Sequence, residues 1–196
     1  MTAFPTATLF EAAGRWGALP SAIKPVVPGW RIEGPAFPVQ GPPGDNLWLH
    51  RAIYAAGPGD ILVVHVGDHH EAGYWGEIMS TAAQARGLGG LVIDGCVRDA
   101  RDLGLVGFPV FSRGLCIRGT AKDRDARGAL AQPVTLGGVT VARGDLIVGD
   151  DDGVLVIRQD RVAATFERAA ARAAKEAAIV ERLKQGETTL AIYDLA

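Results

Sequence analysis

The chain is poor in the residues that would give it cross-links, a membrane span or a strong charge. Its two cysteines, Cys96 and Cys116, are too few for a disulfide framework and favour a reduced, cytoplasmic setting. No apolar run approaches the roughly 20 residues of a membrane span, and the N-terminus lacks the pattern of a signal peptide. The formal net charge of −2 gives no reason to expect nucleic acid as a main partner. The composition therefore gives no support for a disulfide-rich secreted protein, a membrane-spanning protein or a nucleic-acid-binding protein.

Several catalytic patterns are also missing. No serine or cysteine stands in a recognisable nucleophile–histidine motif, and none of the few lysines lies on a clearly apolar strand, which argues against Schiff-base chemistry. The run from Gly87 to Gly90 superficially matches a dinucleotide-binding loop. It follows a helix and precedes a strand, however, which is the reverse of the order that such a loop requires.

What the chain does contain is typical of one α/β domain with an appended helix. The 196 residues are 48% hydrophobic, enough for a core, and the 26 glycines suit tight turns between short strands. Gly137-Gly138 predicts a two-residue hairpin turn. Thr6 is a plausible cap of the first helix, and Leu47, Ile53 and Tyr54 are core candidates in the second. Helices are expected at 6–14, 47–56, 77–86 and 160–185, and strands at 30–39, 61–66, 91–93, 108–111, 133–136, 139–141, 146–148 and 154–157.

The stretch from Gly76 to Asp99 organises the chemistry. A helix that begins at Glu77 and stops at Gly87 is followed by a short apolar strand and then by Arg98-Asp99. Ten helical residues rise about 15 Å, and six extended residues return roughly 20 Å. If the helix and strand pack antiparallel, the helix N-terminus and Arg98-Asp99 therefore meet at one end of the unit.

Such a meeting point suits an anion beside a cation. An arginine and a helix N-terminus both favour a carboxylate, and a neighbouring carboxylate can hold a hard divalent cation with water in the other positions. The alternative is a surface ion pair between Arg98 and Asp99, with Glu77 as an ordinary residue of the first helical turn. Spacing alone leaves both interpretations open.

The same residues resemble a known signature. Gly76-Glu77, followed after twenty intervening residues by Arg98-Asp99, is similar to the pattern of the RraA-like family, although Asp is frequent there at the position of Glu77. This family includes class II 4-hydroxy-4-methyl-2-oxoglutarate / 4-carboxy-4-hydroxy-2-oxoadipate aldolases and a regulator of ribonuclease E. Further similar segments extend the resemblance over essentially the whole chain; they are 34–39, 109–114, 149–154 and 186–193.

The resemblance implies an architecture. It predicts a swivelling β/β/α domain over residues 1–158, and a long C-terminal helix and tail over 159–196 that pack on a neighbouring subunit of a homotrimer or hexamer. The narrow, mostly alanine stripe of this amphipathic helix independently suits close packing on a protein surface. In the resembling aldolases a glutamate from the adjacent subunit completes the outer shell of the metal. Glu176 is the candidate here, with Glu181 and Glu167 as alternatives; all three could equally be solvated residues.

The resemblance also implies a site and a reaction. Asp99 would bind Mg²⁺ or Mn²⁺ directly, and Glu77 would hold water bound to the metal. Arg98, Gly76 and the backbone amides near Ile78 and Met79 would bind the pyruvyl end of the substrate. The expected activity is metal-dependent cleavage of 4-hydroxy-2-oxo acids to pyruvate, with oxaloacetate decarboxylation as a side activity. The alternative is a non-catalytic regulator of ribonuclease activity that binds a protein surface.

Other polar groups allow two interpretations each. His65, His69 and His70 could form a transition-metal site, or could be solvated loop histidines near the pocket mouth. Arg113 could bind an acidic substrate or form a structural ion pair. Tyr74 and Trp75 could line the pocket or only pack. The three aspartates from Asp150 to Asp152 suggest calcium at first sight, but they lack the spacing of a calcium loop, so a hairpin turn with solvated carboxylates is predicted. Residues 120–132 are expected to form a polar surface loop.

Overall fold

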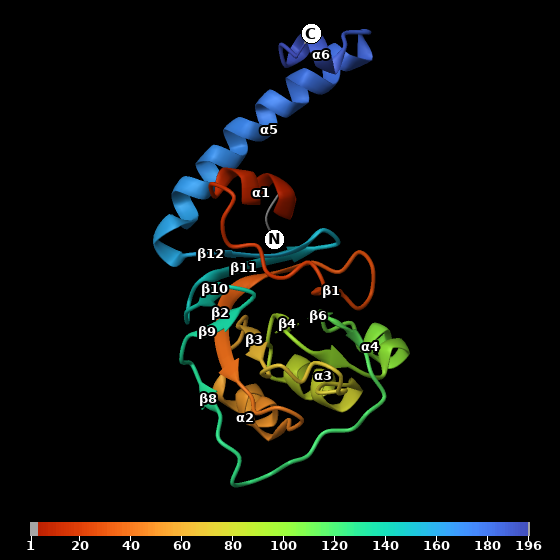
Figure 1. Ribbon diagram of the computed structural model, residues 1–196, viewed down its shortest axis with the longest axis vertical. Helices are drawn as coiled ribbons and strands as arrows, with labels where there is room; N and C mark the ends of the chain where they lie inside the picture. Colours follow the sequence, from red (N-terminus) through yellow and green to blue (C-terminus); the bar gives the residue numbers. More distant parts are fainter. Residues whose placement is uncertain (1–3, 196) are drawn as a thin grey trace.

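The centre of the molecule is an eight-stranded sheet that curls until its ends approach each other (Figure 1). The computed structural model describes residues 4–195. The strand order is β1-β6-β4-β3-β2-β11-β12, with β8 paired to β2. The Lys24 amine of β1 donates to the Asp152 carbonyl beside β12 at 2.6 Å, across the gap between the two end strands. The strands are β1 (Lys24–Pro25), β2 (Ile32–Gln40), β3 (Ile61–His65), β4 (Gly90–Ile93), β6 (Val110–Ser112), β8 (Ala129–Leu130), β11 (Leu146–Asp150) and β12 (Gly153–Ile157).

Three helices connect the parallel strands of this sheet. Helices α2 (Leu47–Ala55), α3 (Glu77–Ala85) and α4 (Ala100–Val106) follow β2, β3 and β4 respectively. Their apolar residues and one face of the sheet form the largest core cluster, which includes Phe37, Trp75 and Phe108. The other face packs on the hairpin of β9 (Val134–Leu136) and β10 (Val139–Val141). The α/β fold expected from the sequence is therefore confirmed.

The parallel strands direct three loops to one edge of the sheet. Strands β2, β3 and β4 run in the same direction. The segments that leave their carboxyl ends, 41–46, 66–76 and 94–99, each lead into the N-terminus of a helix. In sheets of this kind the carboxyl edge is where ligands bind, because loops and positive helix ends gather there.

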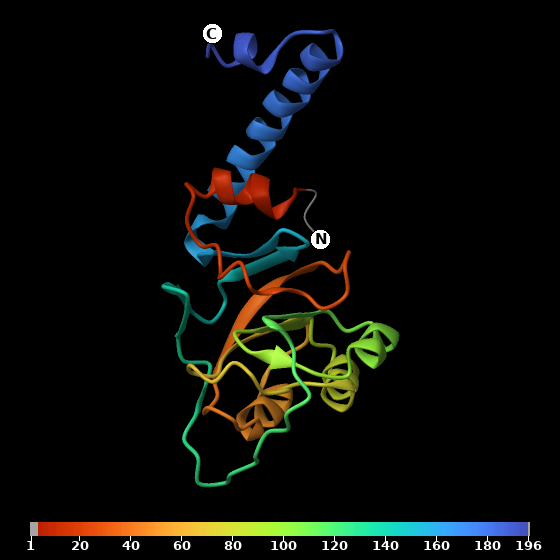
Figure 2. The same ribbon diagram turned by 45° about the vertical axis from the view of Figure 1, so that its right-hand side comes forward.

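The first helix and the start of the long C-terminal helix pack together on the β11–β12 hairpin. Helix α1 (Thr6–Ala12) and the first turns of α5 (Val162–Lys184) cover the β11–β12 hairpin, with Leu9, Leu155 and Ala169 at the centre of this contact. A short 3₁₀ turn, η1 (Gln159–Arg161), leads into α5. The rest of α5 and α6 (Thr189–Ile192) extend away from the body (Figures 1 and 2). No helix in residues 4–195 is long and apolar enough to cross a membrane.

The β9–β10 hairpin confirms the turn predicted from two adjacent glycines. Gly137 and Gly138 have φ values of 54° and 86°, so both occupy the left-handed region that the tight hairpin turn requires. A small separate sheet is formed by β5 (Cys96–Val97) and β7 (Gly114–Leu115), which run parallel. Strand β5 comes directly after β4 and leads into Arg98.

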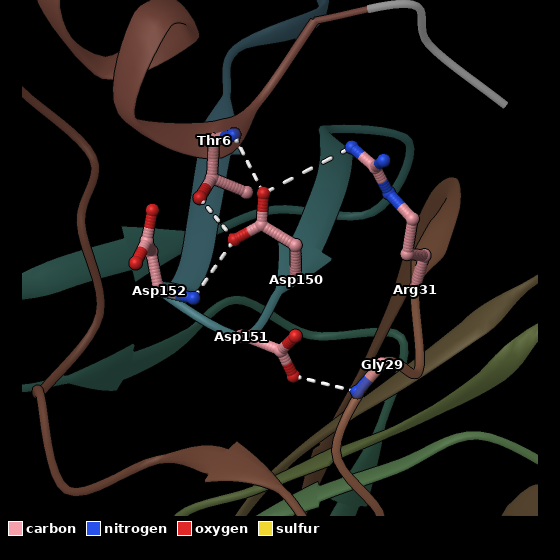
Figure 3. Close-up of polar contacts among 6 residues, drawn as sticks. All are labelled: Thr6, Gly29, Arg31, Asp150, Asp151 and Asp152. Atoms are coloured by element: carbon pink, nitrogen blue, oxygen red, sulfur yellow. Dashed lines mark hydrogen bonds and ion pairs between the residues drawn. The ribbon is translucent and has the colours of Figure 1, made fainter.

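Three sequence expectations about local structure were wrong. Tyr54 is 65% exposed and is not a core residue. Thr6 is the first residue of α1 rather than its cap, and its N–H and hydroxyl both donate to the Asp150 carboxylate (Figure 3). Asp150 does lie at the predicted hairpin turn, but its side chain is only 14% exposed and is not simply solvated. Hydrogen bonds to a charged carboxylate are stronger than the hydrogen bond that a helix-capping threonine would accept, so the buried Thr6 donates to Asp150 instead.

Candidate functional site

A cavity of about 150 Å³ lies at the carboxyl edge of the parallel strands. One wall is made by the start of α3 and by the segment before α4. A second wall is made by the start of α2 and by the long loop before β8. The lining residues are Asn46, His50, Gly73, Tyr74, Trp75, Gly76, Ile78, Met79, Arg98, Asp99 and Lys122.

Backbone hydrogen bonds hold the two parts of the first wall together. The Tyr74 N–H donates to the Cys96 carbonyl at 3.1 Å, and the Arg98 N–H donates to the Trp75 carbonyl at 2.9 Å. These bonds align the loop before α3 with the segment after β4. The Glu77 N–H consequently meets Asp99 Oδ2 at 3.3 Å. The prediction that the α3 N-terminus and Arg98-Asp99 share one end is confirmed by this geometry.

Asp99 occupies an unusual backbone conformation. Its φ of 61° and ψ of 41° are left-handed, which costs energy for a residue with a Cβ but is tolerated best by Asp and Asn. The carboxylate lies so close to Gly76 that a side-chain carbon at position 76 would overlap it. Asp99 Oδ2 is also 3.8 Å from Arg98 Nε, and both side chains are partly exposed, at 40% and 50%. A strained, exposed carboxylate at a cavity is a mark of function more than of stability.

The first turn of α3 presents free donors to the cavity. Gly76 precedes the helix, and no side chain caps it except through the bond from the Glu77 amide to Asp99. Within residues 4–195, the N–H groups of Ile78 and Met79 have no hydrogen-bond partner. These two amides, the positive end of the helix and the Arg98 guanidinium together form a setting that suits a carboxylate.

The predicted site residues divide into those at the cavity and those away from it. Arg98, Asp99, Gly76, Ile78 and Met79 all line the cavity, as expected. The remaining two do not: Glu77 contributes its amide while its side chain is exposed and outside the lining, and Glu176 lies on the projecting part of α5, paired with Arg172 at 2.7 Å. Within one chain Glu176 is therefore not at the site.

Tyr74 and Trp75, just before α3, line the cavity and also pack in the core. Trp75 is 1% exposed, stacks on Phe108 and donates from its indole N–H to Ser80 Oγ at 2.7 Å. The buried Tyr74 hydroxyl donates to the His69 carbonyl, and burial raises the pKa of this phenol. These anchors make the loop before α3 rigid, so that Gly76 has a fixed position.

The second wall was not predicted from the sequence. Asn46 is buried at the start of α2, and its amide nitrogen donates to the Tyr74 carbonyl at 2.9 Å. His50 follows one turn later, and Lys122 comes from the loop that was expected only to cover the surface. Burial and, secondly, the charge of Lys122 lower the pKa of His50. An Asn before an apolar helix is the one sequence signal in this wall, and it indicates a helix start rather than a site.

The other polar candidates have structural roles. The Arg113 guanidinium donates to the buried carboxylate of Asp94, which favours its interpretation as an ion pair. His70 Nδ1 lies 2.7 Å from the Asp94 carbonyl. Among residues 4–195, no three His, Cys, Asp or Glu side chains gather into a group that could hold a metal ion. A histidine site within one chain is therefore not formed.

The surroundings of Asp99 nevertheless fit a hard divalent cation. Mg²⁺ is usually bound through one or two carboxylates, with water and substrate oxygens completing its ligands. Asp99 is a partly exposed carboxylate that borders two spaces, the 150 Å³ cavity and a second of about 430 Å³ next to Leu115 and Ile117. Oxygen ligands from solvent and substrate can therefore reach it.

Comparisons with known proteins identify relatives of this chain. A protein-family model described as RraA-like, Aldolase/RraA, matches residues 6–156. The chain belongs to the RraA-like family. A relative from Halalkalibacterium halodurans is 35% identical over 174 residues, which cover 89% of this chain and 82% of the relative. That protein is named "Putative 4-hydroxy-4-methyl-2-oxoglutarate aldolase".

Two solved structures share the fold of this chain. An uncharacterized protein from Pseudomonas syringae pv. tomato matches with a TM-score of 0.83 at 33% identity, over 95% of this chain and 87% of that one. A Thermus structure titled as the RNA-processing inhibitor RraA matches with a TM-score of 0.71 at 25% identity, over 80% of this chain and 93% of that one. The fold is thus shared with a structure described as an RNA-processing inhibitor, whereas the relative from Halalkalibacterium halodurans carries the name of an aldolase.

Proposed function

We propose that this RraA-like protein is a divalent-metal-dependent aldolase. It would cleave 4-hydroxy-2-oxo acids of the 4-hydroxy-4-methyl-2-oxoglutarate type and release pyruvate. The observation that carries the proposal is the contact between the α3 N-terminus and Asp99, with Arg98 beside them in one cavity. The relative named as such an aldolase supports the substrate class.

The pyruvyl end of the substrate would bind at the first wall. Its carboxylate accepts hydrogen bonds from the free amides of Ile78 and Met79, where the positive end of α3 adds to the attraction. Gly76 has no side chain, which leaves room for the Asp99 carboxylate beside the start of the helix. This arrangement leaves the 2-oxo oxygen within reach of the Arg98 guanidinium, which borders the same cavity.

Cleavage generates an anion that Arg98 can stabilise. Loss of the proton from the 4-hydroxyl lets the bond between C3 and C4 break, and its electron pair moves to the 2-oxo oxygen as an enolate. The Arg98 guanidinium donates to this oxygen, where the charge develops in the transition state. A divalent cation held by Asp99 would, when bound, act as a Lewis acid on the 2-oxo group.

Glu77 is the carboxylate of this chain that can take part in proton transfer. Its side chain is exposed at the start of α3, and its backbone touches the residue that would hold the cation. The Glu77 carboxylate would accept the substrate proton through an intervening water, since its side chain does not line the cavity itself. Return of a proton to C3 completes pyruvate. Oxaloacetate decarboxylation passes through the same enolate, and we propose it as a side activity.

We also propose that the protein assembles as a homotrimer or hexamer through its C-terminal arm, residues 170–195. This arm exposes large apolar side chains, with Val180, Leu190 and Tyr193 each about half accessible or more, at 46%, 53% and 54%. Apolar side chains gathered on a projecting helix favour burial against another subunit. Glu176 could reach the site of a neighbour in this way. Light scattering on the purified full chain tests the proposal, and a monomer at micromolar concentration would contradict it.

The experiment that tests the activity is a pyruvate-release assay. Full-length protein is incubated with 4-hydroxy-4-methyl-2-oxoglutarate or oxaloacetate, with Mg²⁺ or Mn²⁺ and with excess chelator. We expect pyruvate only when the cation is present, and its loss in Arg98→Ala. Arg101→Ala is the matched control, because Arg101 is an exposed arginine three residues away that lies outside the cavity lining. Turnover that survives both chelation and Arg98→Ala would refute the proposal.

A non-catalytic regulator is the second candidate. The likeness to the Thermus structure titled as an RNA-processing inhibitor favours it. Such a protein would bind an endoribonuclease through its surface and would need neither Arg98 nor a cation. Affinity capture with a purified endoribonuclease, together with an absence of pyruvate release, would support this function over the aldolase.

A further inference from the structure

Another cavity, of about 300 Å³, lies where the end of α1, the end of β12 and the start of α5 meet. It shares no lining residue with the cavity that contains Arg98, and the proposed reaction uses none of its residues. Its volume is at the low end of the range for small-molecule sites, which suits a ligand of one or two rings rather than a dinucleotide. The lining residues are Ala13, Trp16, Val156, Ile157, Arg158, Arg161 and Thr165.

The charged side chains that line this cavity are both positive. Arg158 Nε lies 3.5 Å from an Asp160 carboxylate oxygen, but these side chains are 61% and 68% exposed, and an ion pair of this kind is weak. Arg161 forms no ion pair and no side-chain hydrogen bond within residues 4–195. Because Arg161 directly precedes α5, the positive end of that helix adds to the same field. The cavity therefore favours an anion.

Trp16 adds a flat aromatic surface to this positive cavity. It is 45% exposed, whereas the other three tryptophans are buried or half-buried. Backbone hydrogen bonds hold the chain on both sides of it: the Arg15 N–H donates to the Phe10 carbonyl at 2.9 Å, and the Val156 N–H donates to the Gly17 carbonyl at 2.9 Å. An indole that is exposed on an anchored segment can stack on a planar ring of a ligand.

A buried hydroxyl at the same cavity lacks a hydrogen-bond partner. Thr165 is 1% exposed, and its hydroxyl oxygen forms no hydrogen bond within the part of the chain that the structure describes. Most buried polar side-chain atoms do have a partner, so an unpaired hydroxyl at a cavity points to a ligand. The Arg168 side chain donates to the Ala12 carbonyl at 2.7 Å and holds α5 against the end of α1 beside this hydroxyl. Thr165 is thus available to a polar group of a bound molecule.

We propose that this cavity binds a small aromatic anion, a planar ring system that carries a carboxylate or a phosphate. The anionic group pairs with Arg161 and Arg158, and the ring stacks on Trp16. Arg161 contributes more than Arg158, because it has no ion pair to give up. The guanidinium fork matches carboxylate and phosphate alike, so an aromatic carboxylic acid and a nucleotide share the required chemistry. The inference is independent of the proposed reaction, since the two cavities share no lining residue.

The test is a titration of the full-length protein, followed by NMR of the ligand. Naphthalene-2-carboxylate has both the planar ring and the charge, naphthalene-2-carboxamide lacks the charge, and decahydronaphthalene-2-carboxylate lacks the planar ring. The first should bind about tenfold more tightly than either of the others. Arg161→Ala should weaken its binding about tenfold, and Trp16→Leu should weaken it roughly fivefold. Adenosine 5′-monophosphate identifies the source of the ring: its displacement of naphthalene-2-carboxylate assigns the site to nucleotides, and its failure to do so assigns the site to aromatic carboxylic acids.

Two control variants separate this site from its surroundings. Arg15→Ala removes an exposed arginine next to Trp16 that lies outside the cavity lining, and Arg98→Ala removes the arginine of the other cavity. Both should bind naphthalene-2-carboxylate as the wild-type protein does. Arg161 is exposed, so its substitution should leave the fold intact. No binding to the wild-type protein, equal binding of the carboxylate and the carboxamide, unchanged binding in Arg161→Ala or loss of binding in Arg98→Ala would each overturn this inference.

Discussion

The Glu77 N–H donates to Asp99 Oδ2 across 3.3 Å and joins the first turn of α3 to the residue that precedes α4. This bond brings the negative charge of Asp99 to the positive end of a helix, which stabilises the charge. It also uses only one of the free amides, so that those of Ile78 and Met79 remain for a ligand. The site is thus a carboxylate and an anion-binding surface in direct contact.

Gly76→Ala should damage this contact directly. A side-chain carbon at position 76 would overlap the Asp99 carboxylate, while the extended backbone of Gly76, with φ of −158°, accepts alanine without strain. The expected result is therefore displacement of Asp99, with a loss of pyruvate release of about 100-fold. Thermal unfolding should change little, because Asp99 is partly exposed.

The control for this substitution is Gly104→Ala in α4. A side-chain carbon there meets nothing closer than Val27 Cγ2 at 3.6 Å, an ordinary contact, and alanine favours the helix by about 1 kcal/mol. Its activity should match that of the wild-type protein. Full activity in Gly76→Ala would show that the position of the Asp99 carboxylate does not matter for the reaction.

Substitutions of Asp99 should separate chemistry from backbone strain. Asparagine tolerates the left-handed conformation at position 99, whereas alanine there costs about 1 kcal/mol more. Both Asp99→Asn and Asp99→Ala should lose pyruvate release and its dependence on Mg²⁺. Only Asp99→Ala should also lower the unfolding midpoint, by roughly 2–4 °C for a chain of this size. Retained turnover in Asp99→Asn would remove the carboxylate from the mechanism.

The parts of the fold that follow from local pattern are predicted well by the sequence. The apolar strand β3, the Gly137-Gly138 turn and the long amphipathic α5 each have a signal within a few residues. Helix α4 is not predicted, because its seven residues contain Gly104 and expose Leu105 at 77%. Its position depends on packing of Leu103 rather than on helix propensity.

Only part of the candidate site could be predicted, because sequence signals describe local structure and not packing between distant segments. Gly76, Arg98 and Asp99 lie on one helix–strand unit, so their meeting follows from the lengths of two adjacent elements. His50 and Lys122 come from segments far apart in the chain, and their approach depends on the buried Asp45. The Asp45 carboxylate accepts a hydrogen bond from the Asp123 N–H, far along the chain, and no pattern in the sequence predicts such a bond.

The position of Lys122 can be checked through the titration of His50. Burial and then the positive charge of Lys122 lower the pKa of this imidazole below 6.5, while Asp45 opposes them. Lys122→Ala removes one of the two lowering effects, so the pKa of His50 should rise. Proton NMR of the imidazole resonances between pH 4.5 and 8 measures the shift. Arg124→Ala should leave it unchanged, and an unchanged pKa in Lys122→Ala would indicate that the two side chains are apart.

Asp150 should contribute to stability rather than to activity. Its carboxylate accepts the Thr6 N–H at 2.9 Å, the Thr6 hydroxyl and the Asp152 N–H at 3.0 Å, with Arg31 at 3.9 Å (Figure 3). Asp150→Asn would turn an amide N–H₂ toward one of these donors and should lower the free energy of unfolding by about 2 kcal/mol. Asp152→Asn is the control, because the Asp152 side chain is exposed and only its backbone takes part.

The pH dependence of this difference follows from the ionisation of Asp150. Burial opposes the charge, but the hydrogen bonds from Thr6 and Asp152 and the charge of Arg31 outweigh it and hold the pKa of the carboxyl below 3.8 in the folded protein. The stabilisation is therefore fully present above pH 3.8 and is lost as the pH falls through the lower, folded-state pKa. Urea unfolding at pH 7 and in steps from pH 4.5 down to 2.5 should show the deficit of Asp150→Asn shrinking at the acidic end. A deficit that stays constant over this range would mean that the carboxylate charge does not stabilise the contact between α1 and the β11–β12 hairpin.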